Sequence, residues 1–429
     1  MTQRRNRYLS VLRTYQERLA AFQSNARLYL LSVVLTGVAS GIYRLLFNFY
    51  VLSLGYDRTL LGNLVTASNL TALIMAVPMG YCADLLGRKR SLIIGAGLVA
   101  AAIFGMVAWP NVAMFIVMNV LIGLGQALST VTMGPFLMEN SADMERTYLF
   151  SFSSGLMMAS GFVGNWLGGL LPTWAAAVQE VSPTSTAAYS MSLNLTALSG
   201  AVGLLPLFFL VTPRLEKAQR SVFAPFGYFA KKPGLLGKLI LPMLVTSIGA
   251  GLIMPFMNVF FRAAYHQSDP AIGALFAWGS LAMGVGLMIA PPLADRLGKI
   301  QLVVITQGLS IPFLVMLGFS PWFWLSALAY FVRLALMNMS SPVYQTFVME
   351  QVEPSARAMV ASLVSMATSF GWAFSPTISG WIQDHYGFGP AFLGTIGLYV
   401  LSISMYWGFF WAPSRRKQPL AEAGRLRNV

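Results

Sequence analysis

Two arginines inside apolar segments are the residues of this 429-residue chain with the clearest potential for chemistry. Arg44 lies in an apolar run from Leu28 to about Leu54, and Arg333 lies in YFVRLALMNMSSPVYQ, residues 330–345. A guanidinium stays protonated in a protein, and at the middle of a bilayer it costs about 2.5–3.5 kcal/mol on insertion scales. Its planar fork suits carboxylate or phosphate, often through two hydrogen bonds. The two residues therefore predict an anion-binding site.

The depth of the two arginines supports this prediction. Arg44 lies sixteen residues after the start of its apolar run, and Arg333 lies sixteen residues before the end of its own. At 1.5 Å per helical residue, each then stands about 24 Å from the same membrane face. None of the 14 acidic residues falls deep within an apolar run. The alternative is a structural role, in which each arginine bonds backbone carbonyls, extends toward water or stacks on a tyrosine.

Further polar side chains occur in the two apolar segments that contain the arginines and in two others, at about 112–138 and 239–262. They are Asn48, one helical turn after Arg44, and Gln126, Thr130, Asn258, Asn338, Ser341 and Tyr344. Taken singly, each is typical of a hydrogen bond between helices. Together they predict a substrate cavity with few polar groups, as ligand sites tend to have.

The elements that must position these residues are membrane-spanning helices. The chain is 56% hydrophobic and only 10% charged, whereas soluble domains have about 25% charged residues. Apolar runs of about 20 residues, each long enough to cross a bilayer, recur along the whole chain. The sequence predicts an all-α polytopic protein with twelve spans, at about 28–54, 59–82, 91–109, 112–138, 148–172, 188–211, 239–262, 271–293, 301–318, 322–349, 357–382 and 389–411.

The 28 Lys and Arg residues are distributed unevenly along the chain and predict its orientation. If the N-terminus is cytoplasmic, only Arg58 and Arg262 fall outside and only Arg44 and Arg333 fall within spans. This positive-inside bias predicts that both termini are cytoplasmic in a multi-pass protein of the plasma membrane. The net charge of +14 then faces anionic lipid headgroups, and we expect no nucleic-acid partner.

The segments outside the spans are basic. Residues 1–27 predict an amphipathic helix on the membrane surface, with a solvated basic tail as the alternative, and residues 412–429 form a basic cytoplasmic tail. The single cysteine, Cys82, excludes an intramolecular disulfide and a cysteine-based metal site. We expect no metal and no cofactor.

An internal repeat divides the chain into two copies of one bundle. FLMENSADMER (136–146) resembles FVMEQVEPSAR (347–357) at an offset of 211 residues. The predicted domains are a first six-helix bundle over 28–211, a basic cytoplasmic linker over 212–238 and a second bundle over 239–411. Each copy holds an even number of spans, so both enter the membrane in the same orientation, a known plan of transporters.

The loop sequences between spans carry a family resemblance. GYCADLLGRKR (80–90) resembles the signature between spans two and three of the major facilitator superfamily, commonly written G-x-L-A-D-x-x-G-R-K, with Cys82 at the usual Leu position. PPLADRLGKI (291–300) is a degraded copy in the second half. The resemblance covers residues 28–411 and implies two parallel-repeat bundles around a central cavity lined by spans one, four, seven and ten. It also implies that Arg44 and Arg333 project toward that cavity.

Charged residues at the predicted cytoplasmic ends of the spans form candidate gates. Acidic and basic positions recur in both copies, and ion pairs between helix ends can form and break as a gate moves, while glycines permit tight turns. The predicted gating residues are Asp84, Gly87, Arg88, Glu139, Arg146, Asp295, Lys299, Glu350 and Arg357. The alternative is that these charges only determine topology.

The sequence therefore predicts a secondary transporter, not an enzyme, that moves a small or amphipathic organic anion by alternating access. The spans contain no titratable acid or histidine, so three kinds of coupling stay open: exchange of one anion for another as an antiporter, facilitated downhill transport, or titration of a carboxylate at a span end such as Asp57. The nearest match to a phosphate-binding loop, GLLGKL (234–239), lacks the required spacing, so we expect that the protein does not use ATP. We also expect a monomer. The alternatives are a broad-specificity exporter of apolar compounds, favoured by 24 Met and 29 Phe, and a non-transporting receptor or scaffold.

Overall fold

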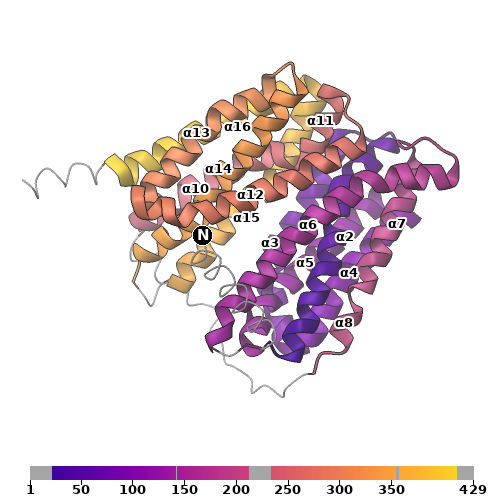
Figure 1. Cartoon of the computed structure of the whole chain (residues 1–429), viewed down its shortest axis with the longest axis horizontal. Coiled ribbons are helices and arrows are strands. Elements are labelled where there is room, and N and C mark those ends of the chain that lie inside the picture. Colours follow the sequence, from indigo (N-terminus) through magenta and orange to yellow (C-terminus); the bar gives the residue numbers. More distant parts are fainter. Residues whose placement is uncertain (1–21, 142, 212–232, 354–356, 413–429) are drawn as a thin grey trace, which may run out of the picture. The chain divides into compact units, whose positions relative to one another are not determined.

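The computed structural model describes residues 22–141, 143–211, 233–353 and 357–412. The predicted N-terminal segment up to residue 21, most of the linker and the tail from residue 413 lie outside the described residues. The described chain is helical throughout (Figure 1), with these elements: α2 (Ser24–Ser53), α3 (Arg58–Leu86), α4 (Arg88–Ala108), α5 (Val112–Glu139), α6 (Asp143–Gln179), α7 (Thr186–Val202), α8 (Leu205–Phe208), α10 (Pro233–Ile253), η1 (Met254–Phe256), α11 (Met257–Tyr265), α12 (Asp269–Leu297), α13 (Lys299–Phe319), α14 (Phe323–Glu350), α15 (Arg357–Tyr386), α16 (Phe388–Tyr406) and η3 (Trp407–Trp411).

Each predicted span corresponds to one helical segment, so the all-α class and the order of spans are confirmed. Among the described residues, ten segments are long and apolar enough to cross a membrane. The predicted spans 148–172 and 357–382 correspond to α6 and α15, with 37 and 30 residues. The largest difference is at α6, which continues to Gln179 because Ala and Val follow Pro172 and favour further helical turns in an apolar setting.

Local sequence determines where several helices begin. Asn111 precedes α5, and its side chain accepts a hydrogen bond from the Met114 amide at 2.9 Å. Ser185 caps α7 in the same way through the Ala188 amide. Gly87 before α4 and Gly298 before α13 have φ angles of 81° and 92°, which glycine adopts far more readily than other residues. These two glycines are 211 residues apart, which is the offset of the sequence repeat.

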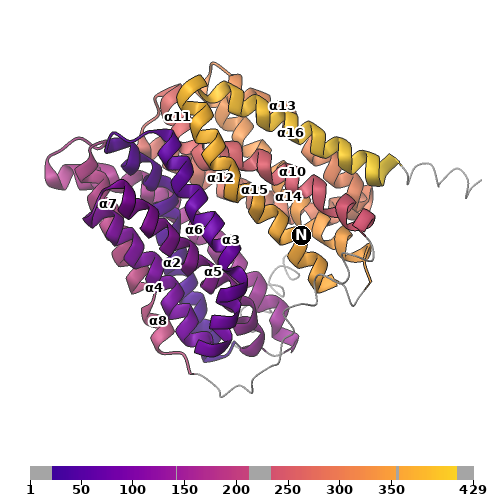
Figure 2. The ribbon, with the colours of Figure 1, turned by 180° about the vertical axis from the view of Figure 1, so that it is seen from behind.

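The chain divides into two compact units. Unit 1 comprises Met1–Phe47 and Ile74–Lys217, and unit 2 comprises Asn48–Leu73 and Ala218–Val429. The division runs through α2 and α3, so one part of each of these helices packs with unit 1 and the other part with unit 2. Within unit 2, α13 and α16 lie side by side in both views of the ribbon (Figures 1 and 2).

Unit 1 is held together by an apolar cluster and by close helix contacts. The cluster joins α2, α4, α5 and α6 through buried residues such as Tyr29, Leu92, Phe136 and Leu149. A Cβ atom added at Gly164 of α6 would lie 2.4 Å from the Val38 carbonyl oxygen of α2. Small residues at this crossing therefore allow α2 and α6 to approach closely, as in many membrane helix pairs.

Unit 2 has its own core and one interrupted helix. Its apolar cluster contains Leu239, Val303, Tyr344 and Tyr406 and so joins α10, α13, α14 and α16. The span that begins with α10 is interrupted after Ile253 by the single turn η1, which contains Pro255, before α11 continues. Proline removes a helical hydrogen bond, so backbone carbonyls at this break need other partners.

Candidate functional site

Arg44 belongs to unit 1 and is exposed to solvent near the point where α2 passes into unit 2. Its guanidinium lies against α6, because a Cβ added at Gly161 would be 3.9 Å from Arg44 Nη2. Gly161 provides space there that a larger residue would fill. The structure thus keeps this permanent charge accessible within an apolar span.

Two further predicted residues of unit 1 are also accessible. Gln126 and Thr130 of α5 are both exposed, and because they are four residues apart they lie on one face of the helix. The neighbouring residues Ala127 and Leu128 are buried. One face of α5 therefore presents an amide and a hydroxyl at this level, while Ala127 and Leu128 pack into unit 1.

Arg333 belongs to unit 2 and is enclosed, with only 2% of its surface exposed. Its Nη2 donates to the Tyr399 hydroxyl of α16 at 3.0 Å, and its Nη1 lies 3.5 Å from Met254 Sδ at the break after α10. Its Cζ is 5.5 Å from the centroid of the Tyr399 ring. Its Nε has no hydrogen-bond partner among the described residues. Within unit 2 this arginine contacts other helices of the bundle.

Asn48 and Asn258, which hold matching places in the two repeats if one residue is inserted in the following loop, form a hydrogen bond with each other. Asn48 Nδ2 donates to Asn258 Oδ1 at 2.9 Å and to the Pro255 carbonyl at 2.7 Å. Asn258 Oδ1 also accepts from the Val259 amide. Both asparagines are buried and both belong to unit 2. Asn48 thus satisfies a backbone carbonyl at the helix break.

The two remaining predicted ligands make helix contacts. Asn338 Nδ2 donates to the Leu334 carbonyl of its own helix at 2.8 Å. The buried Tyr344 donates from its hydroxyl to the Leu239 carbonyl of α10, and its ring packs edge-on against Tyr406 with centroids 4.9 Å apart. In this arrangement both side chains connect structural elements of unit 2.

The predicted gating residues form the same ion pair in each repeat. Arg88 contacts Asp84 at 2.7 Å and Glu139 at 3.0 Å. Lys299 and Glu350, which correspond to Arg88 and Glu139 at the offset of 211, form an ion pair as well. In each pair the two residues lie on different helices and are 51 positions apart in sequence. The repeat detected in the sequence thus corresponds to a repeated contact.

The other predicted gating residues have different surroundings. Arg357 Nε donates to the Met349 carbonyl at 3.0 Å, which connects α15 to the end of α14. Arg146 is half-buried in the first turn of α6, and Asp295 is exposed near the end of α12.

Sequence reasoning missed a charged cluster around α11 in unit 2. Arg262 forms an ion pair with the buried Asp269, and its Cζ lies 3.3 Å from the ring centroid of Phe49 on α2. The sequence placed both charges in a loop, where ion pairs contribute little. Their proximity in sequence and opposite charge were the available signal.

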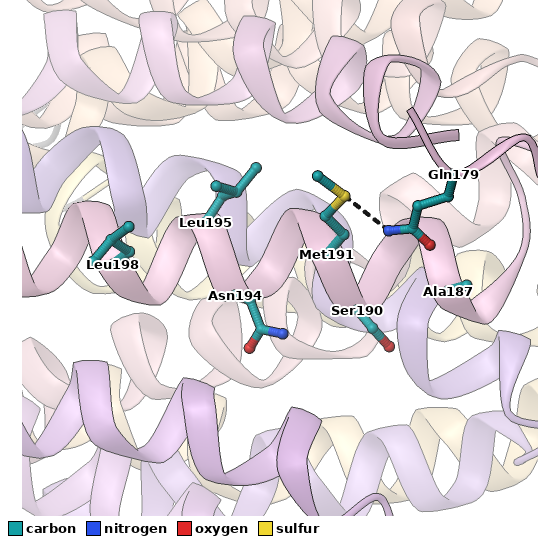
Figure 3. Close-up of a pocket in the computed structure, with 7 residues that line it drawn as sticks. All are labelled: Gln179, Ala187, Ser190, Met191, Asn194, Leu195 and Leu198. Atoms are coloured by element: carbon teal, nitrogen blue, oxygen red, sulfur yellow. Dashed lines mark hydrogen bonds between the residues drawn. The ribbon is translucent and has the colours of Figure 1, made fainter. Parts of the chain in front are cut away.

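A separate cavity lies on α6 and α7 of unit 1 (Figure 3), with a volume of about 520 Å³. Its lining includes Gln179, Ser190, Met191 and Asn194, and Gln179 Nε2 donates to Met191 Sδ at 2.8 Å. None of the predicted substrate-binding residues lines it. Its lining has no charged group, so we do not place the substrate there. Within the described ranges, no cluster of three metal-ligating side chains occurs.

Comparison with known proteins is consistent with this architecture. The chain is 22% identical to the multidrug resistance protein MdtG of Proteus mirabilis over 289 residues, which cover 58% of this chain and 71% of that protein. It is 23% identical to the uncharacterized MFS-type transporter YceJ of Bacillus subtilis over 80% of this chain and 86% of that protein. The crystal structure of the nucleoside transporter NupG superposes with a TM-score of 0.73 at 16% identity, over 90% of this chain and 99% of NupG.

A family model matches both halves of the chain separately. The model described as Major Facilitator Superfamily matches residues 29–249 and again residues 239–428. The two matches correspond to the two copies of the sequence repeat, and the relatives and structural neighbours are transporters rather than enzymes. This chain therefore belongs to the Major Facilitator Superfamily of membrane transporters.

Proposed function

We propose that this transporter moves a small or amphipathic organic anion and that Arg44 recognises the anionic group. The observation that carries the proposal is an exposed arginine within an apolar span. A charge at this depth is energetically costly, and charged residues within membrane spans usually have a function. The fork geometry of the guanidinium suits carboxylate and phosphate. The exposed Gln126 and Thr130 add hydrogen-bonding groups in the same unit.

The other predicted ligands take a secondary part in this proposal. Arg333 would contact substrate only after its guanidinium leaves Tyr399, so Arg44 is the primary ligand. Asn48 and Asn258 bond to each other and would become available only when that bond breaks. Asn338 and Tyr344 would contribute through the positions of α10 and α14, which their hydrogen bonds help to fix.

We propose alternating access as the transport mechanism, with the Arg88 and Lys299 ion pairs at the cytoplasmic side. The positive-inside bias supports this orientation and cytoplasmic termini in the plasma membrane. An inside-negative potential favours outward movement of an anion by about 2.3 kcal/mol per charge per 100 mV. Export or exchange is therefore the proposed direction.

A ligand screen by thermal shift on the purified protein in detergent tests the substrate class. Organic carboxylates, organophosphates, lysophospholipids, sugars and cationic drugs are compared on the wild type, Arg44→Gln, Arg44→Lys and the exposed-charge control Arg90→Gln. A ligand at 100 times its Kd stabilises the folded state by about 2.7 kcal/mol. We expect anions to raise the melting temperature of the wild type and Arg90→Gln, to act weakly on Arg44→Lys and not to act on Arg44→Gln.

A second candidate function is broad-specificity export of apolar compounds. It is favoured by the similarity to proteins named multidrug resistance protein MdtG and by the enclosure of Arg333, which leaves one accessible arginine of the two. If neutral or cationic compounds stabilise the wild type and Arg44→Gln equally, the anion proposal is wrong and this second function replaces it.

A further inference from the structure

A carboxylate at the end of α15 caps the beginning of α3 inside unit 2. Asp384 accepts hydrogen bonds from the Arg58 amide at 3.1 Å, the Thr59 amide at 2.6 Å and the Thr59 hydroxyl at 2.5 Å. The first amides of a helix have no partner within the helix and carry a partial positive charge. The negatively charged Asp384 carboxylate therefore lies at the N-terminus of α3, where the partial positive charge of the helix stabilises it.

Neighbouring contacts hold the same two helix ends together. The Arg58 guanidinium donates to the Gln383 carbonyl at 3.1 Å and lies 5.0 Å from the Phe388 ring centroid. A Cβ at Gly380 would lie 2.3 Å from the Arg58 carbonyl oxygen. The backbones of α3 and α15 thus touch where Asp384 bonds, and glycine is the residue type that allows it.

The sequence around Asp384 has the same pattern as the first loop signature. GWIQDHYG (380–387) and GYCADLLG (80–87) share the spacing G-x-x-x-D-x-x-G, and each stretch ends a helix at a glycine with positive φ, 76° at Gly387 and 81° at Gly87. In the last helical turn an aspartate is unfavourable for its own helix dipole. Each aspartate therefore gains from an outside partner, Arg88 for Asp84 and the start of α3 for Asp384.

The contact connects the two sequence repeats. Helix α3 belongs to the first repeat and α15 to the second, yet the segment Asn48–Leu73 is part of unit 2. A transporter whose repeats move against each other must break this contact and form it again. We propose that Asp384 is a gating residue on the side opposite the loop signatures, and that its bond to the α3 N-terminus holds that side closed.

This inference requires membership of the transporter family but not the anion proposal, and its test uses no substrate. Thr377 of α15 donates a hydrogen bond to Thr66 of α3 at 2.8 Å, so a cysteine at position 377 reports separation of the two helices. In a Cys82→Ser background, Thr377→Cys is labelled with a membrane-impermeant maleimide in vesicles and in detergent. The labelling rate measures the fraction of molecules in which α3 and α15 have separated.

We expect Asp384→Ala, which removes both carboxylate oxygens from the start of α3, to raise the labelling rate roughly fivefold to tenfold, within the range for loss of a helix cap. Asp57→Ala is the matched control, because Asp57 caps the Leu60 amide of its own helix and joins no second helix. It should change the rate less than about twofold, since this cap is lost equally whether α3 and α15 are together or apart. Equal rates in the Asp384 variant and the control would overturn the proposal.

A glycine variant provides an independent readout if Asp384→Ala does not fold. Gly380→Ala places a methyl group against the Arg58 carbonyl and should also accelerate labelling. The control Gly397→Ala adds a methyl group on α16 with no atom within 4 Å, and its rate should match that of the parent. A Gly380→Ala rate equal to that of Gly397→Ala would show that α3 and α15 do not close this side.

Discussion

At the scale of single residues, the two intramembrane arginines have opposite environments. Arg44 is exposed, whereas Arg333 is buried and contacts the phenol of Tyr399 and the thioether of Met254. Burial of a guanidinium is costly unless its donors are satisfied. The Tyr399 hydroxyl accepts a hydrogen bond from Arg333 at 3.0 Å, shorter than the 3.5 Å contact of Arg333 with the Met254 sulfur, so the stability of unit 2 should depend on this one hydroxyl.

Tyr399→Phe should lower the free energy of unfolding by about 1.5–3 kcal/mol, the range for a hydrogen bond to a charged group. The measurement is thermal or denaturant unfolding of the purified protein in detergent. Tyr406→Phe is the control, because Tyr406 is equally buried on α16 and, among the described residues, its hydroxyl bonds only uncharged groups, on Thr246, Tyr344, Ser402 and Met243. Equal losses in the two variants would show that the bond to the charged Arg333 adds no more stability than bonds to uncharged groups.

At the scale of elements, glycines determine how closely helices approach. Gly41 of α2 and Gly164 of α6 lie against each other, since a Cβ at Gly41 would be 2.9 Å from the Gly164 Cα. This contact fixes the face of α2 that packs into unit 1. It therefore also fixes the direction in which Arg44, three residues further along α2, projects.

Gly164→Ala should destabilise the protein by about 1–3 kcal/mol, because the added methyl group overlaps the Val38 carbonyl of α2 and overpacks the crossing. Gly155→Ala on the same helix meets no atom within 4 Å and should be neutral or stabilising by up to about 1 kcal/mol, since alanine favours a helix. Unfolding in detergent measures both. A stable Gly164→Ala would mean that α2 and α6 are not in close contact.

At the scale of the whole molecule, the repeat places one ion pair at equivalent positions of each half. The environments of the two pairs differ. The Arg88 and Glu139 side chains are 17% and 22% exposed, whereas the Lys299 and Glu350 side chains are 34% and 53% exposed. Arg88 also contacts Asp84. The first pair is therefore less screened by solvent than the second.

Double-mutant cycles with Arg88→Gln and Glu139→Gln, and with Lys299→Gln and Glu350→Gln, measure this difference. We expect a coupling free energy of about 0.5–1 kcal/mol for the first pair and a smaller value for the second. Both values should fall as salt is raised from about 0.1 M to 1 M, because screening shortens the range of the interaction. A larger coupling in the second pair would contradict the assignment of the stronger contact to Arg88.

The sequence by itself determined the order of the helices, the family and the recurrence of acidic and basic residues at equivalent positions of the two repeats. These properties are local or repeated. Each apolar run must satisfy its own backbone hydrogen bonds in lipid, and a pattern found twice at one offset indicates the same structure twice.

Only the tertiary structure decided which side chains meet across helices. It bonded Asn48 to Asn258, enclosed Arg333 against Tyr399, left Arg44 exposed and set Asp384 on the N-terminus of α3. Depth in the membrane follows from position in an apolar run. The direction of a side chain around the helix axis depends on crossings such as Gly41 with Gly164, where packing between segments distant in sequence determines the rotation of each helix.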